Sequence, residues 1–281
     1  MRIPSPLQAT VLWLFAMVLV MAAGLAVGAV AAVAALRSGL SIERALELLS
    51  DPKSSPLVNS PTWLAIQVLS SEAVLAVLIW RFLRRHRVFL HEVAPLGVPS
   101  LRDLCGALLC VFGLAPLSGL AAELMRRNLP RDVNAETMVL ALARNVSAGE
   151  LVGVVLATAL VPAVVEELLF RGLLTRAFLG RNTVLTLLVP SIMFAIFHLE
   201  PTQAAGTLVL GFGFALARLY TDSVLTSIVC HLAYNGYVLI DVYAGGQVGD
   251  TDLHLGRVGL GLSIAAFGFG MMVVHPGERR R

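Results

Sequence analysis

The chain has 281 residues, of which 57% are hydrophobic and only 14% are charged. An average soluble domain carries about a quarter charged residues, so this composition excludes a soluble globular protein and indicates an integral membrane protein. The net charge of +3 is small and the arginines cluster in short connections, which argues against nucleic acid as a partner.

Apolar stretches long enough to cross a bilayer recur along the whole chain. About 20 apolar residues span the hydrocarbon core as a helix. The pattern therefore predicts an all-α, polytopic membrane protein of about eight transmembrane helices, whose first span is retained rather than removed as a signal peptide. The predicted spans are 9–36, 62–82, 104–125, 149–178, 183–199, 204–220, 223–244 and 256–275.

The connections between the spans suggest an orientation. We expect 41–61, 91–103 and 136–145 to lie at the membrane surface. Basic residues favour the side shared by both termini, so the positive-inside rule predicts an N-in, C-in topology. Lys53 is the single lysine among 21 Lys and Arg residues, a composition that points to a GC-rich bacterial genome and hence to a bacterial cytoplasmic membrane.

The three cysteines, Cys105, Cys110 and Cys230, all fall in apolar stretches. Their number is odd and their spacing fits no metal-ligand pattern. We interpret them as buried thiols without a disulfide framework.

Polar side chains interrupt three of the predicted spans. An ionisable group inside a span costs at least about 2.5–3.5 kcal/mol on insertion scales, and is by default a hypothesis of a functional site. The polar residues are Glu166, Glu167 and Arg171 in the fourth span, His198 in the fifth, and His231 and Asn235 in the seventh.

The spacing in the fourth span separates the roles of its two glutamates. Glu167 and Arg171 are i,i+4 neighbours on a helix and can neutralise each other, either as part of a site or as a purely structural ion pair. Glu166 points about 100° away from Glu167 and is free to face another partner. Pro162 has no N–H to donate, which predicts a kink or widening one turn before the glutamates.

The other polar residues are expected at a similar depth. Glu166 and His198 lie the same distance from the turn near Asn182, about 24 Å at 1.5 Å per residue. Asn235 lies about 20 Å from the turn that begins the seventh span, with His231 one turn nearer. Each histidine or the asparagine alone has a structural reading as a contact between helices, but together they indicate one buried site. Glu72 of the second span stands alone, and we interpret it as a helix contact.

Three short motifs resemble those of the CAAX protease and bacteriocin-processing (CPBP) family of intramembrane endopeptidases. "EELLFR" (166–171) has the form EExxxR, "FAIFH" (194–198) the form FxxxH, and "HLAYN" (231–235) the form HxxxN. The resemblance covers 145–245, which would be the catalytic core. The N-terminal spans (1–144) precede it, and the last span with a basic tail (246–281) follows.

The resemblance implies an intramembrane protease. Glu166 would activate water, His198 would hold or polarise that water, and His231 with Asn235 would bind the oxyanion. The resemblance gives a supporting role to Glu167, Arg171 and Phe194.

These motifs leave open whether the site binds a metal ion. Glu166, His198 and His231 could bind one zinc ion, whereas Asn235 is an unusual zinc ligand and favours a metal-free site.

The expected partners are a membrane-associated protein or peptide substrate and the lipid bilayer, with the oligomeric state undetermined. The alternatives are a proton-coupled transporter, whose relays also use intramembrane Glu and His, and a non-catalytic immunity or scaffold protein.

Overall fold

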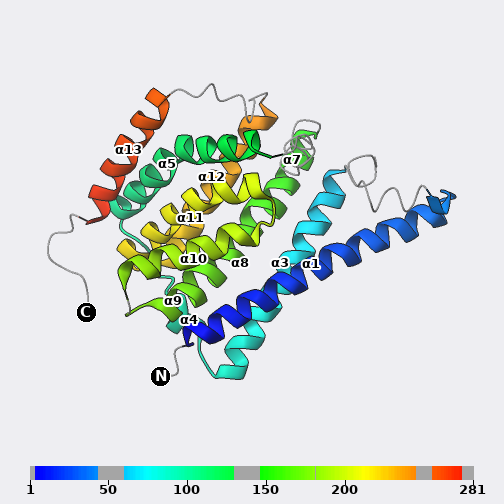
Figure 1. The fold of residues 1–281 in the computed structure, drawn as a ribbon, viewed down its shortest axis with the longest axis horizontal. Coiled ribbons are helices and arrows are strands. Elements are labelled where there is room, and N and C mark those ends of the chain that lie inside the picture. The colour runs from blue at the N-terminus through cyan, green and yellow to red at the C-terminus, as the bar shows by residue number, and fades with distance from the viewer. Residues whose placement is uncertain (1–3, 44–59, 130–145, 181, 245–254, 274–281) are drawn as a thin grey trace.

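A computed structural model describes residues 4–43, 60–129, 146–180, 182–244 and 255–273. Every regular element in these ranges is a helix, as the sequence predicted (Figure 1). The longer helices are α1 (Pro6–Arg37), α3 (Pro61–His86), α5 (Leu101–Arg127), α10 (Thr183–Phe197), α11 (Pro201–Thr221), α12 (Val224–Tyr243) and α13 (Leu255–Val273). The fourth predicted span is a composite of α7 (Ala148–Val155), η2 (Leu156–Leu160), α8 (Val161–Glu167), η3 (Leu168–Leu174) and α9 (Thr175–Phe178).

The prediction of eight spans needs one correction. Seven helices of the described chain are long and apolar enough to cross a membrane, and α10 is not one of them. It has 15 residues, or about 22 Å of helix, against a hydrocarbon core of about 30 Å. The chain is an integral, multi-pass membrane protein in which α10 is a short apolar helix.

Two surface predictions fall outside the described residues, and one about the thiols is wrong. The segment 136–145 and most of 41–61 lie outside the described ranges.

Cys110 and Cys230 are buried as expected, but Cys105 is exposed. An apolar sequence environment did not mean burial for Cys105, because one face of a membrane-spanning helix is itself apolar and turned outward.

The connection at 91–103 is docked onto the bundle through its backbone. It begins in the short helix α4 (Leu90–Val93). The carbonyl of Glu92 accepts a hydrogen bond from Arg176 Nε, the carbonyl of Pro95 from the backbone of Val224, and that of Gly97 from the Ser223 hydroxyl. The segment therefore ties the end of α9 to the start of α12.

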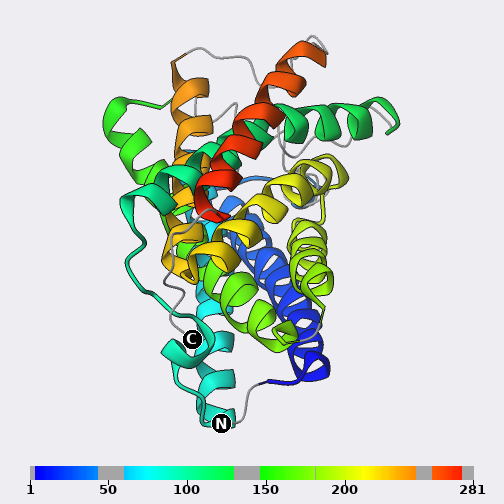
Figure 2. The same ribbon diagram turned by 90° about the vertical axis from the view of Figure 1, so that its left-hand side faces the viewer.

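The helices form two flanks around a central group (Figures 1 and 2). On one flank α1 pairs with α3, and α3 packs against α8 and its neighbours. On the other flank α5 lies between α11 and α13. The central group consists of the composite fourth span with α10, α11 and α12, so the motif-bearing segments are enclosed from both sides.

The contact between α5 and α13 depends on glycines. A Cβ atom built on Gly268 would lie 2.5 Å from the carbonyl oxygen of Gly106, and one built on Gly106 would lie 2.7 Å from that of Gly268. Small residues let helix backbones approach closely in membranes, where no hydrophobic force drives helices together. This contact fixes α5, which in turn supports α11 beneath the site.

The fourth span changes its helical geometry on both sides of the two glutamates. Pro162 lies at the start of α8, directly after the π-helical segment η2, so the widening expected before the glutamates is present. A second π-helical segment, η3, follows Glu167 and contains Arg171. π-helical segments are rare and are frequently found at functional sites. Here they bracket the two acidic residues.

Candidate active site

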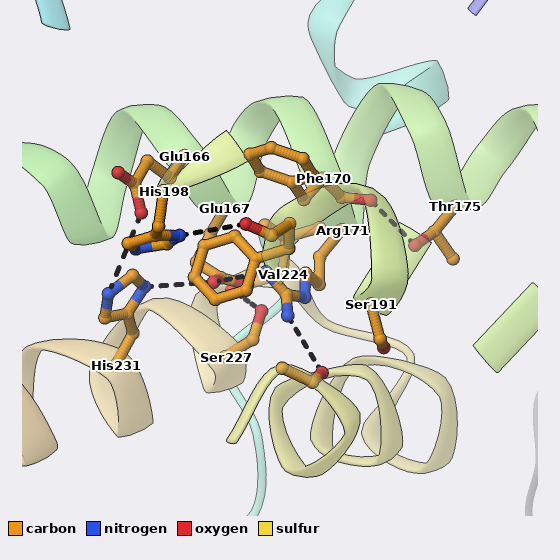
Figure 3. Close-up of polar contacts among 12 residues, drawn as sticks. Glu166, Glu167, Phe170, Arg171, Thr175, Ser191, His198, Val224, Ser227 and His231 are labelled. Atoms are coloured by element: carbon orange, nitrogen blue, oxygen red, sulfur yellow. Dashed lines mark hydrogen bonds and ion pairs between the residues drawn. The ribbon is translucent and has the colours of Figure 1, made fainter. Parts of the chain in front are cut away.

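Three segments far apart in the sequence meet in one polar cluster (Figure 3). Glu166 and Glu167 end α8, His198 caps the C-terminus of α10, and His231 lies within α12. In Figure 3 the Glu166 carboxyl and the two imidazole rings lie at one end of the cluster and Arg171 at the other. The cluster is enclosed in protein, because Glu166, Glu167, Arg171 and His231 are all buried.

Glu167 is the centre of a buried charge network. Its Oε1 accepts hydrogen bonds from Arg171 Nη1 at 2.9 Å and from His231 Nδ1 at 3.0 Å. The side chains of Glu167 and Arg171 have no solvent exposure. An isolated buried carboxylate is costly, and two charge-assisted hydrogen bonds offset this cost for Glu167. The network also fixes the ring orientation of His231.

Arg171 connects this network to α11. Its Nη2 donates to the carbonyl of Gly211 at 2.8 Å. Its guanidinium carbon lies 4.4 Å from the ring centroid of Phe194 and 5.4 Å from that of Phe214. Aromatic faces attract a cation that has lost its water, so Arg171 is held by a carboxylate, a carbonyl and two rings.

His231 turns its second nitrogen toward Glu166. Its Nε2 lies 3.9 Å from Glu166 Oε2. The imidazole stacks on Phe214, with centroids 4.8 Å apart, and lies against the edge of Phe194. The Nδ1 side is therefore occupied by Glu167, and the Nε2 side faces the other acidic residue.

His198 has a defined tautomer in its neutral form. Its Nδ1 lies 2.9 Å from the carbonyl oxygen of Phe194, and a carbonyl only accepts, so Nδ1 carries the proton. Nε2 is then left with a lone pair. The His198 ring also packs edge-on against Phe194, at 4.9 Å between centroids, as the His231 ring does at 5.8 Å. Phe194 thus packs against both imidazoles.

Asn235 follows His231 by one helical turn of α12. It is half-buried, whereas His231 is buried. No described residue hydrogen-bonds the Asn235 carboxamide.

The three candidate metal ligands lie at the same end of the cluster (Figure 3). Within the described ranges, no group of three His, Cys, Asp or Glu side chains is arranged to hold a metal ion. Glu166 and His231 approach each other, but His198 does not complete a three-donor set.

Glu72 lies on a helix that packs against α8, and the sequence did not reveal this packing. It is buried at 5% exposure on α3, and α3 packs against α8. Glu166 and Glu167 are the last two residues of α8. The available signal was a carboxylate in the middle of a span, where a group without a partner is expensive.

The fold and the cluster define a class: a polytopic, all-helical membrane protein with a buried site of carboxylates and imidazoles. Residues 148–237 match the sequence model described as type II CAAX prenyl endopeptidase Rce1-like. All three motif segments lie inside the matched range. The searches of curated proteins and of solved structures gave no match.

Proposed function

We propose that the chain is an intramembrane endopeptidase in which Glu166 activates water to hydrolyse a peptide bond of a membrane-associated protein or peptide. The observation that carries this proposal is the buried meeting of Glu166 with His231, whose orientation Glu167 fixes. Amide hydrolysis needs a base for water and donors for the oxyanion, and this cluster supplies groups of both kinds.

The first step in this mechanism is the activation of water. Glu166 takes one proton from a water molecule while the lone pair of His198 Nε2 accepts a hydrogen bond from the same water. The water oxygen attacks the substrate carbonyl carbon. When the C–N bond breaks, Glu166 returns the proton to the leaving nitrogen, so that it acts first as a base and then as an acid.

His231 and Asn235 are proposed to stabilise the oxyanion. Because His231 Nδ1–H donates to Glu167, a second donor from Nε2 requires the imidazolium form. Glu167 lies in position to stabilise that positive charge, and the stacked Phe214 ring does so as well. The half-buried Asn235 amide is the second proposed donor.

The catalytic core in this proposal is 145–245, in a chain with both termini on the cytoplasmic side of a bacterial inner membrane. The test of the function is a comparison of peptide termini in membranes from cells that make the chain and from cells that lack it. We expect at least one membrane-protein terminus to depend on the chain. If no terminus changes while reconstituted vesicles show proton-coupled flux, the transporter reading replaces this one.

Replacing Asn235 by alanine should lower the turnover number by about 10²–10³-fold without abolishing cleavage, because His231 remains as an oxyanion donor. The measurement is the cleavage rate of an identified substrate by purified protein in detergent or vesicles. The matched control is Asn128→Ala, the same change at the exposed C-terminal end of α5. A wild-type rate for the Asn235 variant would remove Asn235 from the mechanism.

A metal-free mechanism predicts insensitivity to chelators. Dialysis against EDTA or 1,10-phenanthroline should leave the cleavage rate unchanged, because the proposed steps use only side chains and water. Metal analysis of the active protein should find zinc well below one per chain. Loss of activity on chelation, with recovery on adding zinc, would contradict the metal-free proposal.

A further inference from the structure

Glu72 lies in the packed stripe of α3 and not on a face turned toward lipid. The buried residues of this helix are Leu64, Glu72, Leu75, Ile79 and Phe82. Their spacing of three, four, seven and eight residues defines one side of the helix. The carboxyl of Glu72 is therefore carried into the interior of the bundle by the same stripe that packs α3 against its neighbours.

No described residue forms a hydrogen bond or an ion pair with Glu72, and its Oε2 is fully buried without a partner. A polar atom left in this way is costly and calls for an explanation. The site offers an explanation, because α3 packs against α8, the helix that ends in the buried Glu166 and Glu167.

The three carboxyls differ in their contacts. Glu167 accepts hydrogen bonds from Arg171 and His231. Glu166 faces His231 Nε2 at 3.9 Å. Glu72 pairs with no cation among the described residues, and burying a carboxyl without a partner costs least in its neutral form.

We propose that Glu72 is a positioning residue of the active site, whose neutral carboxyl donates a hydrogen bond to a water that bridges it to the Glu166 carboxylate. The inference rests on the proposed function of Glu166. Glu72 would act through Glu166 by keeping one carboxylate oxygen engaged, so that the other is aimed at the attacking water. A neutral donor on α3 would thereby connect the N-terminal flank of the bundle to residues 148–237, which match the family model.

The test compares two replacements of Glu72. Glutamine has the same shape and still donates a hydrogen bond, so Glu72→Gln should keep most of the wild-type kcat. Leucine fills the volume but cannot donate, so Glu72→Leu should lower kcat by about 10- to 100-fold with KM unchanged. The thermal stability of the leucine variant should equal or exceed that of the wild type, because an unpartnered buried carboxyl has been removed.

Two further variants control the comparison. Ala73→Leu introduces the same leucine on the adjacent exposed face of α3 and should leave kcat unchanged. If Glu72→Leu does not give folded protein, Glu72→Met supplies a similar apolar volume on a more adaptable side chain.

The outcomes separate this inference from the proposed function. A wild-type kcat for folded Glu72→Leu, with Glu166→Gln inactive, would overturn the role of Glu72 alone and return it to a helix contact. Equal impairment of Glu72→Gln and Glu72→Leu would also overturn the proposal, since it would show that an ionised carboxylate is needed. Full activity of Glu166→Gln would instead remove the proposed function itself.

Discussion

Glu166→Gln is expected to reduce kcat/KM for an identified substrate by about 10²–10⁴-fold, the usual contribution of a general base. Glutamine keeps the shape of the side chain but cannot take a proton from water. The change should not impair folding, because Glu166 forms no hydrogen bond with a described residue and approaches His231 only at 3.9 Å. The cleavage rate and the melting temperature in detergent, measured on the same preparation, separate loss of chemistry from loss of structure.

The matched control for this variant lies on the same composite span. Glu150→Gln makes the same chemical change in the first turn of α7, where Glu150 completes a capping box with Ser147. Glutamine also serves in a capping box, so this variant should fold and cleave like the wild type. Cleavage by Glu166→Gln at the wild-type rate would show that another group activates the water.

Arg171→Met should destabilise the folded protein by about 3–5 kcal/mol, because it leaves the buried Glu167 carboxylate without its ion-pair partner. The variant also loses the hydrogen bond to the Gly211 carbonyl. The change is measured as the difference in the free energy of unfolding, with the protein in mild detergent and unfolded by heat or by denaturant. Arg102→Met, the same substitution at an exposed position of α5, should shift stability by no more than about 0.5 kcal/mol.

A double variant tests whether the effect comes from an unpaired buried charge. Glu167→Gln combined with Arg171→Met removes both charges and should recover a large part of the lost stability. Activity should not recover with it, because His231 Nδ1 then lacks the carboxylate that stabilises its charged form. If the double variant is as unstable as Arg171→Met alone, the ion pair is not the source of the destabilisation.

The positions of the helices followed from the sequence to within a few residues. Each predicted span corresponds to a helix or, for 149–178, to the composite of α7 to α9, with ends within four residues of the prediction. This succeeds because a bilayer leaves the backbone one local solution, a helix of about 20 apolar residues. The spacing of Glu167 and Arg171 was equally local, and their ion pair is present.

The sequence was less informative wherever distant segments had to meet. The end of the fifth predicted span, 183–199, was placed too late, because the apolar pattern runs on to Leu199 although α10 ends at Phe197 and His198 caps it. That Glu167 holds the His231 ring joins residues 64 positions apart. No local pattern distinguishes this arrangement from one in which Glu167 serves only Arg171.

Glu72 shows most clearly the difference between what the sequence determines and what the tertiary structure determines. Its sequence position established a carboxyl inside a span, and periodicity alone left a helix contact as the simpler interpretation. Only the tertiary structure shows that α3 packs against α8, the helix that carries Glu166. The cost of burying a charge is set by whatever surrounds it in three dimensions, so the sequence determined which polar groups enter the membrane, and the tertiary structure decided which of them share one site.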